Sequence, residues 1–234
     1  MTETFSHFGF LNAFKPPGMT STAFGGWVKH LLDKTPVGHW GTLDPTACGV
    51  LVLAIGHATR LLPLLSPSHK QYVFDLKLGS STDTADESGR VLETGPLPAG
   101  WSDRLESVAA GLVGPLDQIP PMYSAVKVAG RALYVSARRG QHVARAARPT
   151  KVHALRVLSH SERSARLLVE CDAGLYVRSL CEEIGRQLGV PAHMGALVRT
   201  AAGPFSLGSA YLPEDIAKAP DACLLDPLSV LRGP

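Results

Sequence analysis

The sequence lacks the signatures of several large protein classes. Its four cysteines form no C-x-x-C pair, and their spacing is not that of a disulfide framework. Its nine histidines form neither an H-x-x-x-H nor an H-E-x-x-H pattern, so we expect no metal site. The glycine-rich patterns G-x-G-x-x-G and G-x-x-x-x-G-K-[ST] are both absent, so we expect no cofactor.

Long apolar runs are also missing. The charge-free stretch Pro45 to Thr59 is too short to cross a bilayer as a helix. Residues Met1 to His7 contain no basic segment that leads into an apolar run, so no secretory signal is predicted. We therefore expect a cytoplasmic monomer with free thiols and no membrane partner.

One segment is almost free of charge, which draws attention to Asp44. It is the only formally charged residue between Lys34 and Arg60, and the apolar run Val50 to Ile55 follows it. A carboxylate beside a core segment is costly to desolvate unless cations or hydrogen bonds compensate it. Two interpretations are open. Asp44 and Pro45 are typical of the cap and first residue of a helix, and an aspartate on a glycine-rich loop is also typical of a nucleophile.

Acidic residues are absent between Gln118 and Ser161, where eight basic residues gather. These are Lys127, Arg131, Arg138, Arg139, Arg145, Arg148, Lys151 and Arg156. The rest of the chain has 15 basic against 20 acidic residues, so this segment makes the net charge positive. We interpret residues 118–161 as a segment that binds RNA phosphates, with a solvated surface as the alternative.

The pattern of apolar residues predicts both strands and helices. Strands are predicted at Phe10–Ala13, Val50–Ile55, Tyr72–Leu78, Lys151–Leu158 and Leu167–Cys171. Helices are predicted at Thr22–Leu32, Ala58–Leu65, Trp101–Leu112 and Ser179–Leu188. Because the two kinds of element do not alternate strictly, they favour an α+β fold over a doubly wound parallel sheet.

The segment around Asp44 resembles a known catalytic motif. Gly38–Leu51 reads GHWGTLDPTACGVL and resembles the pattern G-H-x-G-x-L-D-P-x-A-x-G-x-L of the bacterial TruB type of tRNA pseudouridine synthase. Further segments match motifs of this family in order: Lys15–Ser21, Lys70–Tyr72, Thr82–Asp86, Pro121–Ala125, Gly174–Arg178 and Ala196–Arg199. The resemblance extends over roughly residues 10 to 210.

The resemblance implies a fold and a reaction. The fold is a mixed, largely antiparallel sheet flanked by helices with a central active-site cleft, in one catalytic domain over residues 1–234. The reaction is the isomerisation of uridine 55 in the T loop of tRNA, with the T stem-loop as partner. Asp44 is then the catalytic carboxylate, and Arg178 is the cation that keeps it ionised. Attack at C1′, addition at C6 and proton removal from C2′ are all compatible with the sequence.

The same resemblance implies how the base is held. A uridine in a folded loop must swing out into a pocket, where aromatic faces stack on it. Tyr72 and Tyr176 are the stacking candidates. Leu197 is a candidate apolar wall, and His39 is the candidate that supports the vacated space. Core packing is the alternative for each of these four residues.

The sequence also departs from the family. Trp40 stands where relatives often carry a small residue, and stacking and packing are both open for it. Only 35 residues follow Arg199, so we expect no full C-terminal domain of the PUA type. Two competing functions are considered: a non-catalytic protein that binds or folds tRNA, and a glycoside or nucleoside hydrolase, which needs a second carboxylate or a metal.

Overall fold

The computed structural model describes residues 7–65, 69–124, 126–128, 130–137, 139–141 and 143–232. The chain divides into two compact units. The first unit comprises residues 1–72 and 197–234, and the second comprises residues 73–196. Strands β4 (Lys70–Leu78) and β12 (Ala192–Ala202) each have residues in both units. Over the described residues, every helix is too short or too polar to cross a membrane.

The first unit is built around β3 (Cys48–Ile55). Strand β1 (Gly9–Lys15) pairs with it antiparallel from end to end. On the other edge of β3, β2 (Val37–Trp40) pairs antiparallel with the second half, and β12 pairs parallel with the start. Strand β13 (Phe205–Ser206) folds back on the end of β12.

Both faces of β3 are buried, which explains its continuous apolar sequence. Leu51, Leu53 and Ile55 pack with the apolar residues of α1 (Ser21–Leu31). Val50, Val52 and Ala54, which point to the opposite face because side chains alternate along a strand, pack with another group that includes Phe205. The other helices of this unit are η1 (Gly56–Leu64), η2 (Leu207–Ser209), α5 (Pro213–Lys218), η3 (Asp221–Cys223) and α6 (Pro227–Arg232).

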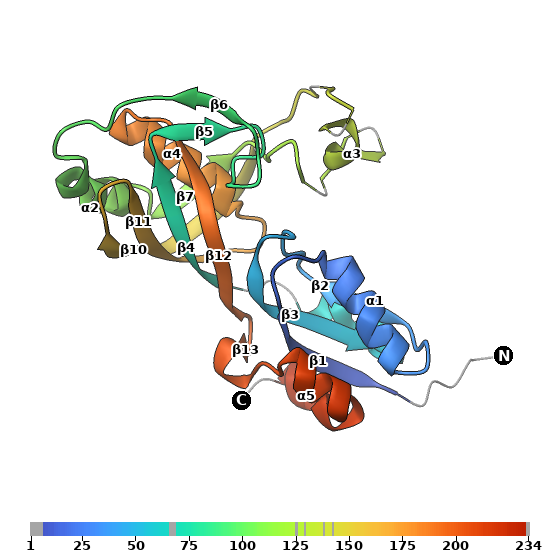
Figure 1. Cartoon of the computed structure of the whole chain (residues 1–234). Helices are drawn as coiled ribbons and strands as arrows, with labels where there is room; N and C mark the ends of the chain where they lie inside the picture. The colour runs from blue at the N-terminus through green and yellow to red at the C-terminus, as the bar shows by residue number, and fades with distance from the viewer. Residues whose placement is uncertain are drawn as a thin grey trace. The chain divides into compact units, whose positions relative to one another are not determined.

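The second unit carries strands in the order β4, β11 (Ser164–Cys171), β10 (Arg148–His160) and β7 (Gly114–Gln118). Strand β10 pairs antiparallel with both β11 and β7. Helix α2 (Trp101–Gly111) packs against β10 and against α4 (Val177–Leu188) (Figure 1). The smaller elements are β5 (Ser80–Thr82), β6 (Val91–Thr94), β8 (Lys127–Val128), β9 (Arg131–Ala132) and α3 (Leu133–Ala137).

The α+β prediction is confirmed, as are all five predicted strands and three of the four predicted helices. The predicted helix Ala58–Leu65 forms as the 3-10 helix η1 and contains Pro63, which lacks the N–H group that an α-helix needs. The interpretation of Asp44 as a helix cap is wrong. No helix begins there, and the amide of Ala47 closes a turn on the Asp44 carbonyl at 3.1 Å.

Candidate functional site

Asp44 lies on the connection between β2 and β3. We call residues 41–49, which include the first two residues of β3, the Asp44 loop. Glycines with positive φ stand at its two ends, Gly41 at 75° and Gly49 at 106°. A Cβ atom on Gly49 would lie 2.3 Å from the carbonyl oxygen of Arg199 on β12. Gly49 therefore allows the backbone of β12 to approach the end of the loop, which no other residue would permit.

The backbone on both sides of Asp44 is held by hydrogen bonds. The Ser21 hydroxyl donates to the Leu43 carbonyl at 3.0 Å and accepts from the Leu43 amide at 2.9 Å. The Gly18 amide donates to the Pro45 carbonyl at 2.8 Å. Because its two neighbours are anchored, the carboxylate projects from a fixed point of the chain.

The turn that contains Gly18 is itself held by a buried lysine. Lys15 is fully buried, and its Nζ donates to the carbonyls of Pro16 at 2.7 Å and Met19 at 2.8 Å. Burial lowers the pKa of Lys15 to about 8, while the nearby acidic groups Cys48 and Asp44 act in the opposite direction. Lys15 therefore stabilises the turn and lies within electrostatic reach of Asp44, which is itself partly exposed.

His39 lies on β2, just before the Asp44 loop. One ring nitrogen is 3.2 Å from the Thr42 hydroxyl. Burial lowers the pKa of His39, and the positive charge of Arg199 lowers it further, so the ring is held neutral. A neutral imidazole suits a role in filling space rather than in neutralising phosphate. Its neighbour Trp40 packs against the core group that includes Phe205, which favours packing over stacking.

Tyr72 on β4 and Leu197 on β12 are both buried in the first unit, each with 7% of its surface exposed. This burial fits core packing as well as a partly covered wall for a base. Their substrate-binding roles remain predictions.

Tyr176 and Arg178 lie at the start of α4, in the second unit. The side-chain amide of Gln118 donates to the Tyr176 carbonyl at 3.2 Å, and its oxygen accepts from the Tyr176 amide at 2.9 Å. This paired contact fixes the point where the chain enters the helix. The Tyr176 residue is half-buried, and its role in stacking remains a prediction.

Arg178 is 4% exposed and donates to the Thr84 carbonyl at 3.1 Å and the Tyr123 carbonyl at 2.9 Å. A positive charge in the first turn of a helix interacts unfavourably with the helix dipole, and the hydrogen bonds to the two carbonyls offset that free-energy cost. Because Arg178 and Asp44 belong to different units, their pairing remains a prediction.

The basic segment is largely open to solvent where the structure describes it. Arg139, Arg148, Lys151 and Arg156 are exposed, whereas Arg145 is half-buried. Arg145 uses one nitrogen to donate to the Pro120 carbonyl at 2.9 Å. Outside the described residues lie Arg138 and the side chains of Lys127 and Arg131.

Three functional candidates were missed by sequence reasoning: Ser21, Gln118 and Arg199. Ser21 and Arg199 stand in segments that resemble family motifs, so the signal was present without a role attached to it. Gln118 offers no sequence signal, because an isolated glutamine between an acidic and an apolar residue is typical of a surface strand.

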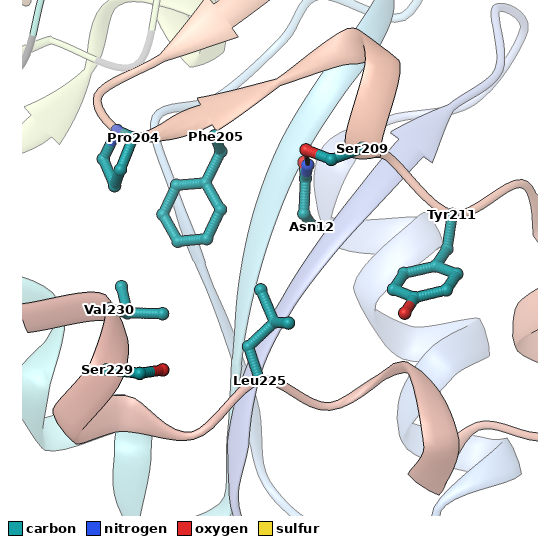
Figure 2. Close-up of a pocket in the computed structure, with 8 residues that line it drawn as sticks. All are labelled: Asn12, Pro204, Phe205, Ser209, Tyr211, Leu225, Ser229 and Val230. Carbon is teal, nitrogen blue, oxygen red and sulfur yellow. Dashed lines mark hydrogen bonds between the residues drawn. The ribbon is translucent and has the colours of Figure 1, made fainter. Parts of the chain in front are cut away.

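The first unit also holds a pocket of about 330 Å³, with Phe205, Leu225 and Val230 among its walls (Figure 2). Asn12 reaches it from β1, and Figure 2 shows its amide beside the hydroxyl of Ser209, to which it donates at 3.0 Å. None of the six predicted site residues lines this pocket, so it is separate from the candidate site.

Comparison with known proteins gives two matching family models that together cover most of the chain. One is described as the TruB family pseudouridylate synthase N-terminal domain and matches residues 29–177. The other is described as the tRNA pseudouridylate synthase B C-terminal domain and matches residues 178–223.

Curated relatives and solved structures agree with these models. The chain is 44% identical over 215 residues to tRNA pseudouridine synthase B of Heliobacterium modesticaldum, covering 91% of this chain and 70% of that one. It is 42% identical over 214 residues to the Bacillus licheniformis protein of the same name, covering 89% and 69%. Among solved structures, a Cbf5–Nop10–Gar1 complex is similar with a TM-score of 0.71 and 34% identity, over 91% of this chain and 54% of that one. The chain thus spans about half the length of that structural relative.

Proposed function

The chain belongs to the TruB family of pseudouridylate synthases, and we propose that it converts uridine 55 in the T loop of tRNA into pseudouridine. One observation carries the proposal: a single carboxylate, Asp44, is partly exposed on a loop whose backbone is anchored on both sides of it. Relatives at 44% and 42% identity bear the name tRNA pseudouridine synthase B, which supports tRNA as the substrate class.

The reaction is an isomerisation in which atoms and electrons balance within the substrate and water. The N1–C1′ bond breaks, the base turns, and a C5–C1′ bond forms. The hydrogen on C5 leaves as a proton, and N1 gains a proton from solvent, so nothing is oxidised or reduced. Asp44 needs only to be ionised and close to the sugar and base, whether it attacks C1′, adds to C6 or removes a proton from C2′.

The remaining site residues position the uridine in this proposal. Tyr72 and Tyr176 stack on the flipped base, and Leu197 closes the apolar side. His39, held neutral by burial and by Arg199, supports the space that the base leaves. Arg178 supplies the positive charge that keeps the Asp44 carboxyl ionised.

The exposed cations of the basic segment hold the RNA backbone. Arg139, Arg148, Lys151 and Arg156 offer guanidinium and ammonium groups that neutralise phosphates and release counterions. Binding of tRNA should therefore weaken steeply as the salt concentration rises. A salt-independent Kd would remove this segment from the RNA interface.

Tritium release tests the function directly. A tRNA transcript labelled at C5 of uridine should lose one tritium per molecule to water, and a transcript with cytidine at position 55 should lose none. Asp44→Asn should bind the labelled tRNA within about threefold of wild type and release tritium at least about 10³-fold more slowly, since a group used only in the chemical step changes kcat.

Other outcomes separate the competing functions. Binding of tRNA with no tritium release from either protein would favour a non-catalytic RNA-binding protein. Free uracil as the product would favour a hydrolase. The family assignment already argues against the non-catalytic alternative, because the relatives above are named as synthases.

A further inference from the structure

We propose that Arg199 is a positioning residue that ties the two ends of the Asp44 loop together and thereby fixes the catalytic carboxylate. Its effect on the reaction rests on the proposed function. Its effect on the loop does not, because that effect can be measured in the protein without RNA.

The hydrogen bonds of Arg199 span the whole loop. Its Nη2 donates to the carbonyl of Gly41, the first residue of the loop, at 2.9 Å. Its Nε donates to the carbonyl of Val50, the residue after the loop, at 2.7 Å. Each is a charge-assisted bond, roughly twice as strong as a neutral one, so the base of the loop cannot open without losing a strong contact.

The glycines at the two loop ends both lie against this arginine. A Cβ atom on Gly41 would lie 3.3 Å from Nη1 of Arg199 and 2.9 Å from Nζ of Lys70. A Cβ atom on Gly49 would lie 2.3 Å from the Arg199 carbonyl oxygen and 2.8 Å from its amide nitrogen. The backbone of Arg199 therefore limits the space at Gly49, and its side chain limits the space at Gly41 together with Lys70.

Core packing alone does not explain an arginine at this position. Arg199 is fully buried, and within the part of the chain that the structure describes its Nη1 is buried without a hydrogen-bond partner. A buried charge with an unsatisfied donor costs free energy that an apolar side chain of similar size would not. The chain carries a guanidinium here despite that cost, which fits a role that needs a forked donor.

The charge of Arg199 also acts on the surroundings of the loop. After burial, it is a further cause of the lowered pKa of His39, which lies on β2 just before the loop. It acts in the same direction on Lys15, which holds the turn bonded to Pro45. Arg199 thus acts by contact on both ends of the Asp44 loop. By its charge it acts on His39, just before the loop, and on Lys15, which holds the neighbouring turn.

Two variants separate the forked geometry from the charge. Arg199→Lys keeps the charge but lacks the planar fork that contacts both carbonyls, and Arg199→Gln keeps a planar donor without the charge. Arg166→Lys is the matched control. It removes another forked arginine from a strand, one whose side chain is 56% exposed and bonded to Asp75 at 2.8 and 3.2 Å.

Single-turnover kinetics with the C5-tritiated tRNA give the first readout. For both Arg199 variants we expect kcat to fall about 10- to 100-fold, because small misplacements of a reacting group have effects of this size. The Kd for tRNA should stay within about twofold, since a loss confined to the reacting geometry leaves ground-state binding intact. Arg166→Lys should match wild type in both. A raised Kd with unchanged kcat would overturn the proposal in favour of RNA binding.

Hydrogen exchange without RNA gives the second readout. The amides of Leu43 and Ala47, bonded to Ser21 and to Asp44, report loop opening. They should exchange at least about tenfold faster in both Arg199 variants, while the amides of β11 keep wild-type rates. Unchanged exchange in the loop would refute the positioning role. Should wild type release no tritium, the proposed function fails, and exchange alone still decides whether Arg199 fixes the loop.

Discussion

Each unit contains a buried arginine, and the two differ in what their guanidinium groups hold. Arg199 in the first unit bridges the two ends of one short segment, the Asp44 loop. Arg178 in the second unit bonds the carbonyls of Thr84 and Tyr123, which stand in segments far apart in sequence. Both are nearly or fully inaccessible to solvent, yet one closes a local loop and the other links distant parts of its unit.

The difference lies in the elements that carry them. Arg199 is on β12, where the neighbouring strand β3 supplies the Val50 carbonyl and the start of the Asp44 loop supplies the Gly41 carbonyl. Arg178 is in the first turn of α4, where the helix offers free N–H groups and no free carbonyls, so its acceptors must come from elsewhere. The two arginines therefore have different roles in our proposal. Arg199 holds the Asp44 loop, and Arg178 links the segments around the start of α4.

The sharpest test of this difference between Arg178 and Arg199 is to replace Arg178 by methionine. We expect kcat to fall by about 10²–10³-fold, more than for either Arg199 variant, because Arg178 is proposed to supply the charge that keeps the Asp44 carboxyl ionised. The measurement is single-turnover tritium release beside a filter-binding Kd. The loop amides of Leu43 and Ala47 should keep their exchange rates in this variant.

Equal losses of kcat for Arg178→Met and Arg199→Lys would erase the distinction between the two arginines. Faster exchange in the Asp44 loop after Arg178→Met would erase it as well, since only Arg199 is proposed to hold that loop.

The approach of β12 to the Asp44 loop gives a second test, on stability. Gly49→Ala should lower the free energy of unfolding by about 2–4 kcal/mol, because the new methyl group overlaps the backbone of Arg199 at a positive φ. Gly18→Ala is the control. Its φ is 88°, and nothing lies within 4 Å of the new carbon, so only strain of about 1 kcal/mol is expected. Urea denaturation of both variants measures the difference.

A similar loss for the two alanine variants would show that the left-handed backbone alone sets the cost. The contact between β12 and the loop end would then be loose enough to move aside, and the role proposed for Arg199 would lose its geometric support.

Sequence reasoning succeeded where apolar residues carry the signal. The core strand β3 is a continuous apolar run, and α4 places Leu180, Ile184 and Leu188 on its buried face before Gly189 ends it. These patterns are local, so they can be read without knowing which segments meet. The family motif around Asp44 likewise marked the loop that the structure anchors.

The same reasoning missed the features that depend on contacts between segments far apart in the sequence. Strand β12 has the sequence AHMGALVRTAA, with one glycine and few β-branched residues, and its position comes from parallel pairing with β3. An arginine in such a stretch is typical of a surface, and only the fold shows that Arg199 is buried. The roles of Gln118 and Ser21 depend in the same way on partners that the sequence does not bring near.

Lys15 extends the comparison from arginines, which stay charged, to a buried cation that can lose its proton. Burial lowers its pKa from 10.5 to about 8 in the folded state, so between these values the unfolded chain binds more protons than the folded one. Folding stability from this residue therefore rises with pH across that interval and is lowest below pH 8. The neutral amine still has hydrogens for the carbonyls of Pro16 and Met19, so the turn keeps its bonds.

Urea denaturation from pH 7 to 10 measures this effect against Lys15→Met. The unfolding free energy of wild type should rise relative to the variant by about 1–3 kcal/mol over that range, because one proton contributes about 1.4 kcal/mol per pH unit. Lys218→Met, which removes an exposed lysine on α5, should run parallel to wild type. If the difference in unfolding free energy between wild type and Lys15→Met does not change with pH, the buried ammonium is already compensated by its surroundings. Lys15 and the two arginines would then differ only in the geometry of their hydrogen bonds, and charge would contribute little to the stability of the Asp44 loop.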